Sequence, residues 1–266
     1  MKVKIAAAQM NSGNDRRATL IRMEEMTREA AAAGADLILF PEHADFIGKP
    51  MSQYAETDHG ELAASLGKLA ADNEIWLHCG SIPERNPDGK PFNTSLFFNR
   101  KGNLVAKYRK IHLFEVDLSD GPAVNESDII EAGREVMVAD TDFGRVGFAI
   151  CYDLRFPELF HTMADLGAEL IFMPADFTAM TGKDHWEVLL RARAIENTCY
   201  VAAANQIGEK PDFVSYGHSI IIDPWGRILA EKEEGEGLIY ADFDTETVRR
   251  IRRQMPSLKN ARKDLW

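Results

Sequence analysis

The chain has 266 residues, of which 45% are hydrophobic and 27% are charged, a composition typical of one large α/β domain with a substantial core. Its formal net charge of −11 argues against a nucleic-acid partner, which requires clustered cations. The apolar runs are too short to span a membrane, and three widely spaced cysteines do not make a disulfide framework. We therefore expect a cytoplasmic protein with neither a membrane nor a nucleic acid as partner.

Strands alternate with helices in the first half of the chain. Helical spacing of Leu20, Met23 and Met26 leads into an Ala-rich stretch that Gly34 ends, and the segments on both sides are short and apolar. A second amphipathic helix and a turn between two β-rich runs follow. We expect a strand, a helix, a strand, a helix, a strand and a hairpin at residues 3–9, 16–34, 36–40, 61–73, 75–82 and 92–110.

The second half has the same order of elements and contains an internal repeat. The segment GADLILFPEH at 34–43 matches GAELIFMPAD at 167–176 in most positions, and each closes a strand–helix–strand unit. Such alternation predicts parallel strands with helices outside, so we expect two similar halves whose sheets pack together in one α/β domain over 1–266. Asp184 and Glu187 are a candidate capping pair for the fourth helix. The second-half elements are expected at residues 145–151, 156–167, 169–173, 183–206 and 216–232.

Two of the predicted parallel strands carry reactive groups at their carboxyl ends, where functional atoms gather in α/β sheets. One of them ends at Cys151 and is followed at once by charged residues. The N–H groups of a helix that begins at such a turn stabilise a thiolate. Cys79 and Cys199 lie inside apolar strands and are expected to be structural. Cys151 is therefore the candidate nucleophile.

A thiol nucleophile needs a base, and none of the seven histidines stands out by local sequence. Glu42 follows an apolar strand and Pro41, so burial is expected to raise its pKa and make it a base. Lys110, in YRKIHLF, is expected to point inward, where its ammonium would lower the thiol pKa and stabilise negative charge on a carbonyl oxygen. The alternatives are a solvated loop glutamate and an ordinary surface lysine.

Seven short motifs resemble the nitrilase superfamily of carbon–nitrogen hydrolases, above all its branch of omega-amidases and deaminated-glutathione amidases. They span nearly the whole chain and are FPEH, YRKIHLF, NES, GFAICYDLRFPE, HWEVLLRARAIE, YGHS and DPWG. The resemblance implies a single-domain, four-layer αββα sandwich that forms a homodimer or a higher homo-oligomer. It also implies a catalytic triad of Glu42, Lys110 and Cys151, with no metal and no organic cofactor.

The reaction that the resemblance implies is hydrolysis of a small linear amide to an acid and ammonia through a cysteine thioester. An omega-amide of a dicarboxylic acid is the expected substrate. Glu42 would take the thiol proton, while Lys110 and the backbone N–H of Tyr152 would hold the oxyanion. Glu126 would orient Lys110 or the substrate amide through hydrogen bonds.

Four further residues are expected to contact the substrate, namely Arg155, Asp176, Phe177 and His185. Arg155 suits a substrate carboxylate because a guanidinium fork binds one with two hydrogen bonds. The alternative for Arg155 is an ion pair with Asp153 or Glu158. Asp176 stands where relatives usually carry a small residue, and a charge there would repel an anionic substrate.

Several other functions would use the same residues. A short-chain aliphatic amidase, a deaminated-glutathione amidase, an N-carbamoyl hydrolase and a nitrile hydrolase all fit the triad. A redox or protease-like role for Cys151 would want a resolving cysteine or a histidine partner, and a catalytically silent binding module would be expected to lack a triad residue. A metal site at Glu42, His43 and Asp45 matches no established ligand spacing, so no metal is expected.

The end of the chain is locally basic, with four arginines between positions 249 and 253. In an otherwise acidic protein this pattern indicates a solvated or subunit-facing helix. Ile251, Met255 and Leu258 in the same region would gain more from a partner surface than from water. We therefore expect the C-terminal region to take part in a homodimer interface.

Overall fold

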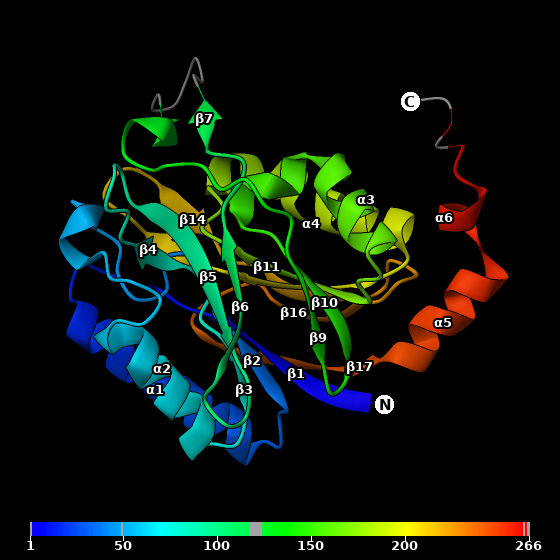
Figure 1. The fold of residues 1–266 in the computed structure, drawn as a ribbon, viewed down its shortest axis with the longest axis horizontal. Coiled ribbons are helices and arrows are strands. Elements are labelled where there is room, and N and C mark those ends of the chain that lie inside the picture. Colours follow the sequence, from blue (N-terminus) through cyan, green and yellow to red (C-terminus); the bar gives the residue numbers. More distant parts are fainter. Residues whose placement is uncertain (1, 49, 117–123, 263, 265–266) are drawn as a thin grey trace.

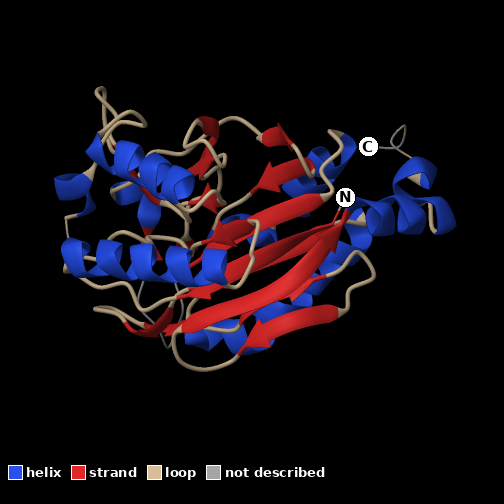
Figure 2. Cartoon of the chain, turned by 90° about the horizontal axis from the view of Figure 1, so that it is seen from below, coloured by secondary structure: helices blue, strands red, loops and turns tan. Residues whose placement is uncertain are grey.

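Two β-sheets lie face to face between outer layers of helices in the computed structural model, which describes residues 2–48, 50–116, 124–262 and 264 (Figures 1 and 2). The first sheet has seven strands in the order β17-β1-β2-β3-β5-β4, with β6 paired to β5. Its strands are β1 (Lys2–Gln9), β2 (Leu37–Leu39), β3 (Trp76–His78), β4 (Ile82–Glu84), β5 (Phe92–Phe98), β6 (Leu104–Arg109) and β17 (Gly237–Asp244).

The second sheet has six strands in the order β16-β15-β12-β11-β10-β9. They are β9 (Val138–Thr141), β10 (Gly144–Phe148), β11 (Leu170–Ala175), β12 (Tyr200–Asn205), β15 (Ser219–Ile222) and β16 (Ile228–Lys232). Two small ladders lie apart from the sheets and are formed by β7 (Glu115–Val116) with β8 (Val124–Asn125), and by β13 (Ile207–Glu209) with β14 (Val214–Tyr216).

Helices cover the outer face of each sheet (Figure 2). Helices α1 (Arg16–Ala32) and α2 (Glu61–Asp72) pack on the first sheet, and α3 (Pro157–Asp165) and α4 (Ala179–Asn197) pack on the second. Helices α5 (Thr245–Gln254) and α6 (Ser257–Asn260) extend to one side (Figure 1). Three short 3₁₀ helices are η1 (Met51–Tyr54), η2 (Glu126–Asp128) and η3 (Cys151–Arg155). No helix in the described part of the chain combines the length and the apolar character needed to cross a bilayer.

The alternating burial of the strands explains the layers. On β2, Leu37 and Leu39 face the second sheet and join Phe148 and Phe172 in the central core. Ile38, between them in sequence, points the other way and packs under the outer helices α1 and α2. Both faces of the strand are apolar because both are covered, as parallel strands require.

The internal repeat corresponds to the middle strand of each sheet. β2 lies between β1 and β3, and β11 lies between β10 and β12, with parallel pairing on both sides in each case. Gly34 and Gly167 adopt positive φ angles of 74° and 95° at the start of the two repeats, where the preceding helix ends. The predicted four-layer αββα sandwich and its twofold internal similarity are confirmed.

Three local predictions are wrong. The strand expected at 75–82 is broken into β3 and β4, because Gly80 has a φ of +72° and a side chain there would meet the Pro41 carbonyl oxygen at 1.8 Å. The fourth helix begins at Ala179, with Thr178 in the N-cap position, so Asp184 and Glu187 lie within the helix and form no capping pair. The strand expected to reach Cys151 ends at Phe148, and the cysteine opens η3 instead.

Candidate active site

The three predicted catalytic residues come together where the carboxyl ends of strands from the two sheets meet. Glu42 follows β2 in the first sheet, and Cys151 follows β10 in the second sheet. Lys110 follows β6 and is 2% exposed, so it points inward and is not a surface lysine. Glu42 is also 2% exposed and Cys151 is 8% exposed, so a solvated loop glutamate is excluded as well.

Lys110 links the two glutamates that the sequence singled out. Its Nζ lies 2.9 Å from Glu42 Oε1 and 2.8 Å from Glu126 Oε2. Asn93, fully buried on β5, donates from Nδ2 to Glu42 Oε1 at 2.8 Å and reaches Glu126 Oε1 at 3.5 Å. The backbone N–H of Phe114 donates to Glu126 Oε2 at 2.7 Å. One buried ammonium is thus shared by two carboxylates that neighbouring donors hold in place.

The nucleophile candidate sits on a tight turn. Cys151 has a φ of +47°, which is uncommon for a residue with a side chain and requires support from its surroundings. Asp153, which is completely buried, supplies that support. Its carboxylate accepts hydrogen bonds from the backbone N–H of Ile150 at 2.8 Å, from the Tyr108 hydroxyl at 2.7 Å and from the backbone N–H of His112 at 3.0 Å.

The charges of the site oppose a raised pKa for Glu42. Burial alone would raise that pKa, but Lys110, His43 and hydrogen bonds from Cys151 and Lys110 outweigh burial and lower it to about 2. The expectation of a raised pKa for Glu42 is therefore wrong. Burial also works against the charge of Lys110, but Glu126 and Glu42 raise its pKa well above the usual value.

The pKa of the Cys151 thiol is raised, whereas that of Glu42 is lowered. Burial and the nearby Glu42 carboxylate raise the pKa of Cys151 well above its usual value, while Lys110 acts to lower it. Lys110 lowers the pKa of Cys151 as expected, but its effect is smaller than the combined effect of burial and Glu42. At neutral pH the resting site consequently holds a thiol, an ammonium and the Glu42 carboxylate.

Arg155 lies beside the aromatic side chains that line this region. Its Nη1 is 3.3 Å from His185 Nδ1, and its guanidinium lies over the rings of Tyr152 and Phe177 at 5.7 Å and 5.2 Å from their centroids. Both oxygens of the Asp153 carboxylate are occupied elsewhere. Within the described residues, Arg155 forms no ion pair with Asp153 or with Glu158.

Asp176 belongs to the wall of the site through its backbone as well as its side chain. Its N–H donates to Glu42 Oε2 at 2.9 Å, and its carboxylate is hydrogen-bonded to the Ser215 hydroxyl. Burial raises the pKa of Asp176 to about 6. The adjacent Phe177 is 4% exposed, and its ring packs against Trp186 at 5.0 Å. The structure therefore brings Arg155, Phe177 and His185 together. It places Asp176 in contact with Glu42 through the backbone N–H of Asp176.

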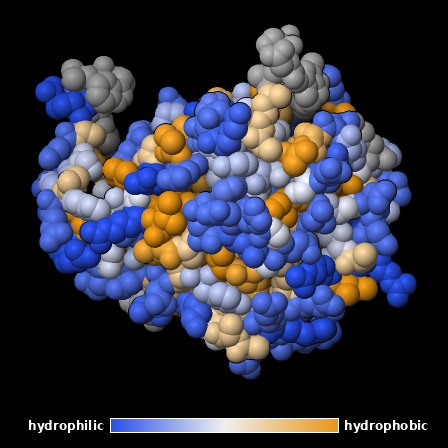
Figure 3. Space-filling model, turned by 180° about the vertical axis from the view of Figure 1, so that it is seen from behind, coloured by the Kyte–Doolittle hydropathy of each residue, from blue (hydrophilic) through white to orange (hydrophobic). Residues whose placement is uncertain are grey.

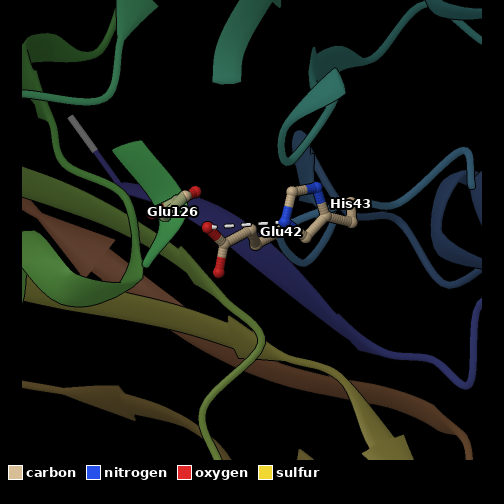
Figure 4. Close-up of side chains that lie close together, drawn as sticks. All are labelled: Glu42, His43 and Glu126. Carbon is tan, nitrogen blue, oxygen red and sulfur yellow. Dashed lines mark ion pairs between the residues drawn. The ribbon is translucent and has the colours of Figure 1, made fainter. Parts of the chain in front are cut away.

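Three positioning residues were missed from the sequence. Asn93 opens the polar run Asn-Thr-Ser inside the strand FNTSLFF, and polar groups in a strand whose faces are covered need partners, which is the signal that could have identified it. Gln206 follows β12, and its Nε2 donates to the backbone oxygen of Glu42 at 2.9 Å. His43 has its Nε2 only 3.9 Å from Glu42 Oε1, whereas no histidine had stood out before (Figure 4).

The residues weighed as a metal site are separated in the structure. Asp45 pairs with Arg16 at 3.1 Å, and Glu126 takes its place near Glu42 and His43, with ligand atoms within 4.8 Å of one another (Figure 4). Lys110 already places a positive charge between the two carboxylates. This donor set therefore fits an ion-pair network better than a metal centre.

Comparison with known proteins identifies the family of the chain. The family model described as carbon–nitrogen hydrolase matches residues 4–253. The deaminated glutathione amidase of Homo sapiens is 39% identical over 98% of this chain and 83% of its own length, and the human omega-amidase NIT2 is 37% identical over 99% and 96%. A solved variant of the amidase from Nesterenkonia sp. AN1, which carries the acetamide moiety of fluoroacetamide covalently at its active-site cysteine, has a TM-score of 0.83 at 26% identity and covers 99% of this chain and 95% of its own. The chain belongs to the carbon–nitrogen hydrolase family, within the nitrilase superfamily.

Proposed function

We propose that this enzyme is an amidase that hydrolyses small linear amides to an acid and ammonia through a thioester on Cys151. The observation that carries the proposal is the buried Lys110 ammonium, which contacts Glu42 and Glu126 beside the thiol. The names of its relatives point to amides, and the Nesterenkonia amidase bears its adduct on a cysteine. An omega-amide of a dicarboxylic acid is the proposed substrate class. The whole chain, 1–266, is proposed to form one such domain.

The first half of the reaction makes the thioester. Glu42 accepts the Cys151 proton as the sulfur attacks the amide carbonyl carbon. The carbonyl oxygen becomes an oxyanion, which the Lys110 ammonium and the backbone N–H of Tyr152 stabilise. The carbon–nitrogen bond then breaks, and Glu42 returns the proton to the nitrogen, which leaves as ammonia.

The second half consumes one water. Glu42, again a carboxylate, takes a proton from the water as its oxygen attacks the thioester carbon. The same donors hold the second oxyanion, the carbon–sulfur bond breaks, and the proton on Glu42 passes to the departing sulfur. The products are the free acid and the restored thiol. Glu126 holds Lys110 in place throughout, because both of its oxygens are fixed by neighbouring donors.

Specificity for a carboxylate-bearing amide is proposed to come from Arg155. Its guanidinium is half-buried against aromatic rings and has no carboxylate partner in the described part of the chain. A cation in this position suits the remote carboxylate of a substrate. Phe177 and His185 fix the guanidinium from two sides.

Ammonia release from a panel of short amides tests the proposal. Cys151→Ala should abolish release, whereas Cys79→Ala should not, because the Cys79 thiol is completely buried in the core. Mass spectrometry of the wild-type enzyme mixed with substrate should show an adduct equal to the acyl group on the peptide that contains Cys151. Amide hydrolysis by Cys151→Ala at more than a few per cent of the wild-type rate would refute the proposal.

A homodimer in the cytoplasm is proposed as the working form. Apolar side chains are exposed on α4 and on the turn between β15 and β16, including Val188, Ile195 and Trp225 at 66%, 47% and 48%. Figure 3, the view from behind, shows apolar surface gathered toward the side of the C-terminal helices. All three cysteines are free thiols, in keeping with a reducing compartment.

The C-terminal helices fit this role only in part. Met255 is 47% exposed and remains available to a partner. Ile251 is 3% exposed and packs within its own chain, and Arg252 donates to the carbonyl oxygens of Ala168 and Thr198 at 2.6 Å and 3.2 Å. Those two residues are therefore neither solvated nor free for an interface. Sedimentation at micromolar concentration should give a dimer or larger, and a pure monomer would refute the assembly.

A further inference from the structure

One histidine lies among the acidic groups of the site without belonging to the triad. His43 Nε2 is 3.9 Å from Glu42 Oε1, and the two side chains point toward each other (Figure 4). Glu126, from η2, places a carboxylate oxygen within 4.8 Å of the same set of atoms. The second ring nitrogen, Nδ1, is buried and has no hydrogen-bond partner among the described residues. The imidazole is therefore held by the backbone around it and not by a partner on its ring.

The backbone of His43 is fixed in an unusual conformation. Its φ of +53° is rare for a residue with a side chain. The Ser81 hydroxyl accepts a hydrogen bond from the His43 N–H at 3.1 Å, and the His43 carbonyl oxygen accepts one from Gln206 Nε2 at 3.5 Å. Such a conformation persists where the surroundings impose it, as at functional sites. The ring is consequently presented to Glu42 in one orientation.

The charged groups around the imidazole come from several elements. Glu42 and Asp45 lie on its own loop, Glu126 comes from η2, Asp176 follows β11, and Lys110 lies between the two glutamates. Burial raises the pKa of both Asp45 and Asp176 to about 6, and His43 acts against that rise at each of them. His43 also contributes to the lowered pKa of Glu42.

This arrangement gives the enzyme a variable charge next to its base. The Lys110 ammonium is permanent at working pH, whereas a histidine changes charge between about pH 5 and 8. We propose that the charge on His43 controls how readily Glu42 accepts a proton, so that protonated His43 weakens the base and slows the reaction. The inference rests on the proposed role of Glu42. His43 acts through Glu42 and is a positioning residue.

The test is the pH profile of kcat/KM for a neutral amide such as propionamide, from pH 5 to 9. Wild-type activity should fall on the acid side of this profile, because a positive charge on His43 weakens the base. His43→Asn is neutral at every pH, and asparagine tolerates a positive φ. Its acid limb should move to lower pH, so that at pH 5.5 it keeps roughly three- to tenfold more of its own maximum than the wild type does, because rate follows base strength.

A second variant should move the profile the other way. His43→Lys carries a fixed positive charge, so its rate at pH 8 should drop to about the level that the wild type has on its acid limb. The matched control is His59→Asn, because His59 Nε2 is also 3.9 Å from a carboxylate, Asp58 Oδ1, but its side chain is 83% exposed. Its profile should match the wild type.

The proposal is overturned if His43→Asn retains the wild-type acid limb, or if His43→Lys keeps the wild-type rate at pH 8. Loss of the acid limb in Asp176→Asn, but not in His43→Asn, would assign the titration to Asp176 and would also overturn it. The proposal is also overturned if the activity of the wild-type enzyme does not fall on the acid side of the profile. These failures differ from failure of the proposed function, in which Cys151→Ala would keep its activity.

Discussion

The hydroxyl of Tyr108 donates a 2.7 Å hydrogen bond to Asp153 Oδ2, and this one contact ties the first sheet to the turn that carries the nucleophile. Tyr108 lies on β6 and is 1% exposed, while Asp153 lies on η3 after β10. The same carboxylate oxygen accepts the backbone N–H of Ile150, next to Cys151. The position of the thiol thus depends in part on a residue of the other sheet.

Tyr108→Phe should loosen this turn. Removing a hydrogen bond to a buried carboxylate costs about 1.5–3 kcal/mol of unfolding free energy. We expect that loss in urea unfolding, together with a lower kcat, because Cys151 would be held less firmly in its left-handed conformation. Tyr240→Phe, on β17, is the control and should change neither quantity. A Tyr108→Phe enzyme with full kcat would show that the turn does not depend on this bond.

Arg155→Met should change substrate choice more than bond cleavage. A dicarboxylic monoamide loses its charged hydrogen bond, worth about 1.5–3 kcal/mol, whereas propionamide loses no contact. The ratio of the two kcat/KM values should therefore fall about tenfold or more. Arg145→Met, which removes an exposed ion pair with Asp140 and a hydrogen bond to the Leu166 carbonyl oxygen, should leave the ratio unchanged. Equal losses on both substrates would mean that Arg155 is structural.

The carboxyl group of Asp176 should make that preference depend on pH. Burial raises its pKa to about 6, so the group is neutral below this value and anionic above it. Repulsion of an anionic amide should therefore grow as pH rises through about 6, and the ratio of kcat/KM for anionic over neutral substrate should fall. Asp176→Asn should make the ratio flat over the same range. The ratio cancels any effect of His43 on Glu42, since both substrates share that step.

His78 should reduce stability in acid. Burial lowers its pKa from 6.5 to about 3, and its ring packs against those of Phe148 and Phe172, with centroids 5.6 Å and 5.0 Å away. Below pH 6.5 the unfolded chain binds a proton that the folded chain refuses until about pH 3, so the contribution of His78 is complete above 6.5 and is lost as pH falls.

The measurement is the unfolding free energy in urea at pH 7 and pH 5. A depressed pKa costs about 1.4 kcal/mol for each pH unit between the two values, so the wild type should lose about 2 kcal/mol more than His78→Phe over this interval. Comparing each protein with itself removes the packing cost of the new ring. Equal losses in both proteins would show that His78 takes up its proton while folded.

Sequence reasoning found the parts of the site that depend on neighbours along the chain. A carboxylate after Pro41 and a thiol near the end of an apolar strand follow from the rule that functional groups gather at the carboxyl ends of parallel strands. The pKa of Glu42 could not be found that way. It is set by Lys110, which is 68 positions away in sequence and 2.9 Å away in space.

The remaining errors have a similar origin. Asn93 bridges the two glutamates only because β5 pairs with β3 and β4 in one sheet, which the order of the chain does not reveal. The break at Gly80 follows from the close approach of another loop at Pro41. Contacts of this kind belong to the assembled sheets, and no local pattern encodes them.

The two copies of the internal repeat contribute different chemical groups to the site. When its copies are aligned, Glu42 corresponds to Ala175 and His43 corresponds to Asp176. The backbone ends of both copies reach the same place, yet one copy supplies the carboxylate and the other supplies a methyl group and a backbone N–H that holds it. The backbone is nearly symmetric, but only the first copy of the repeat supplies a catalytic side chain. Neither half could therefore replace the other in the reaction, although the backbones of the two halves have similar shapes.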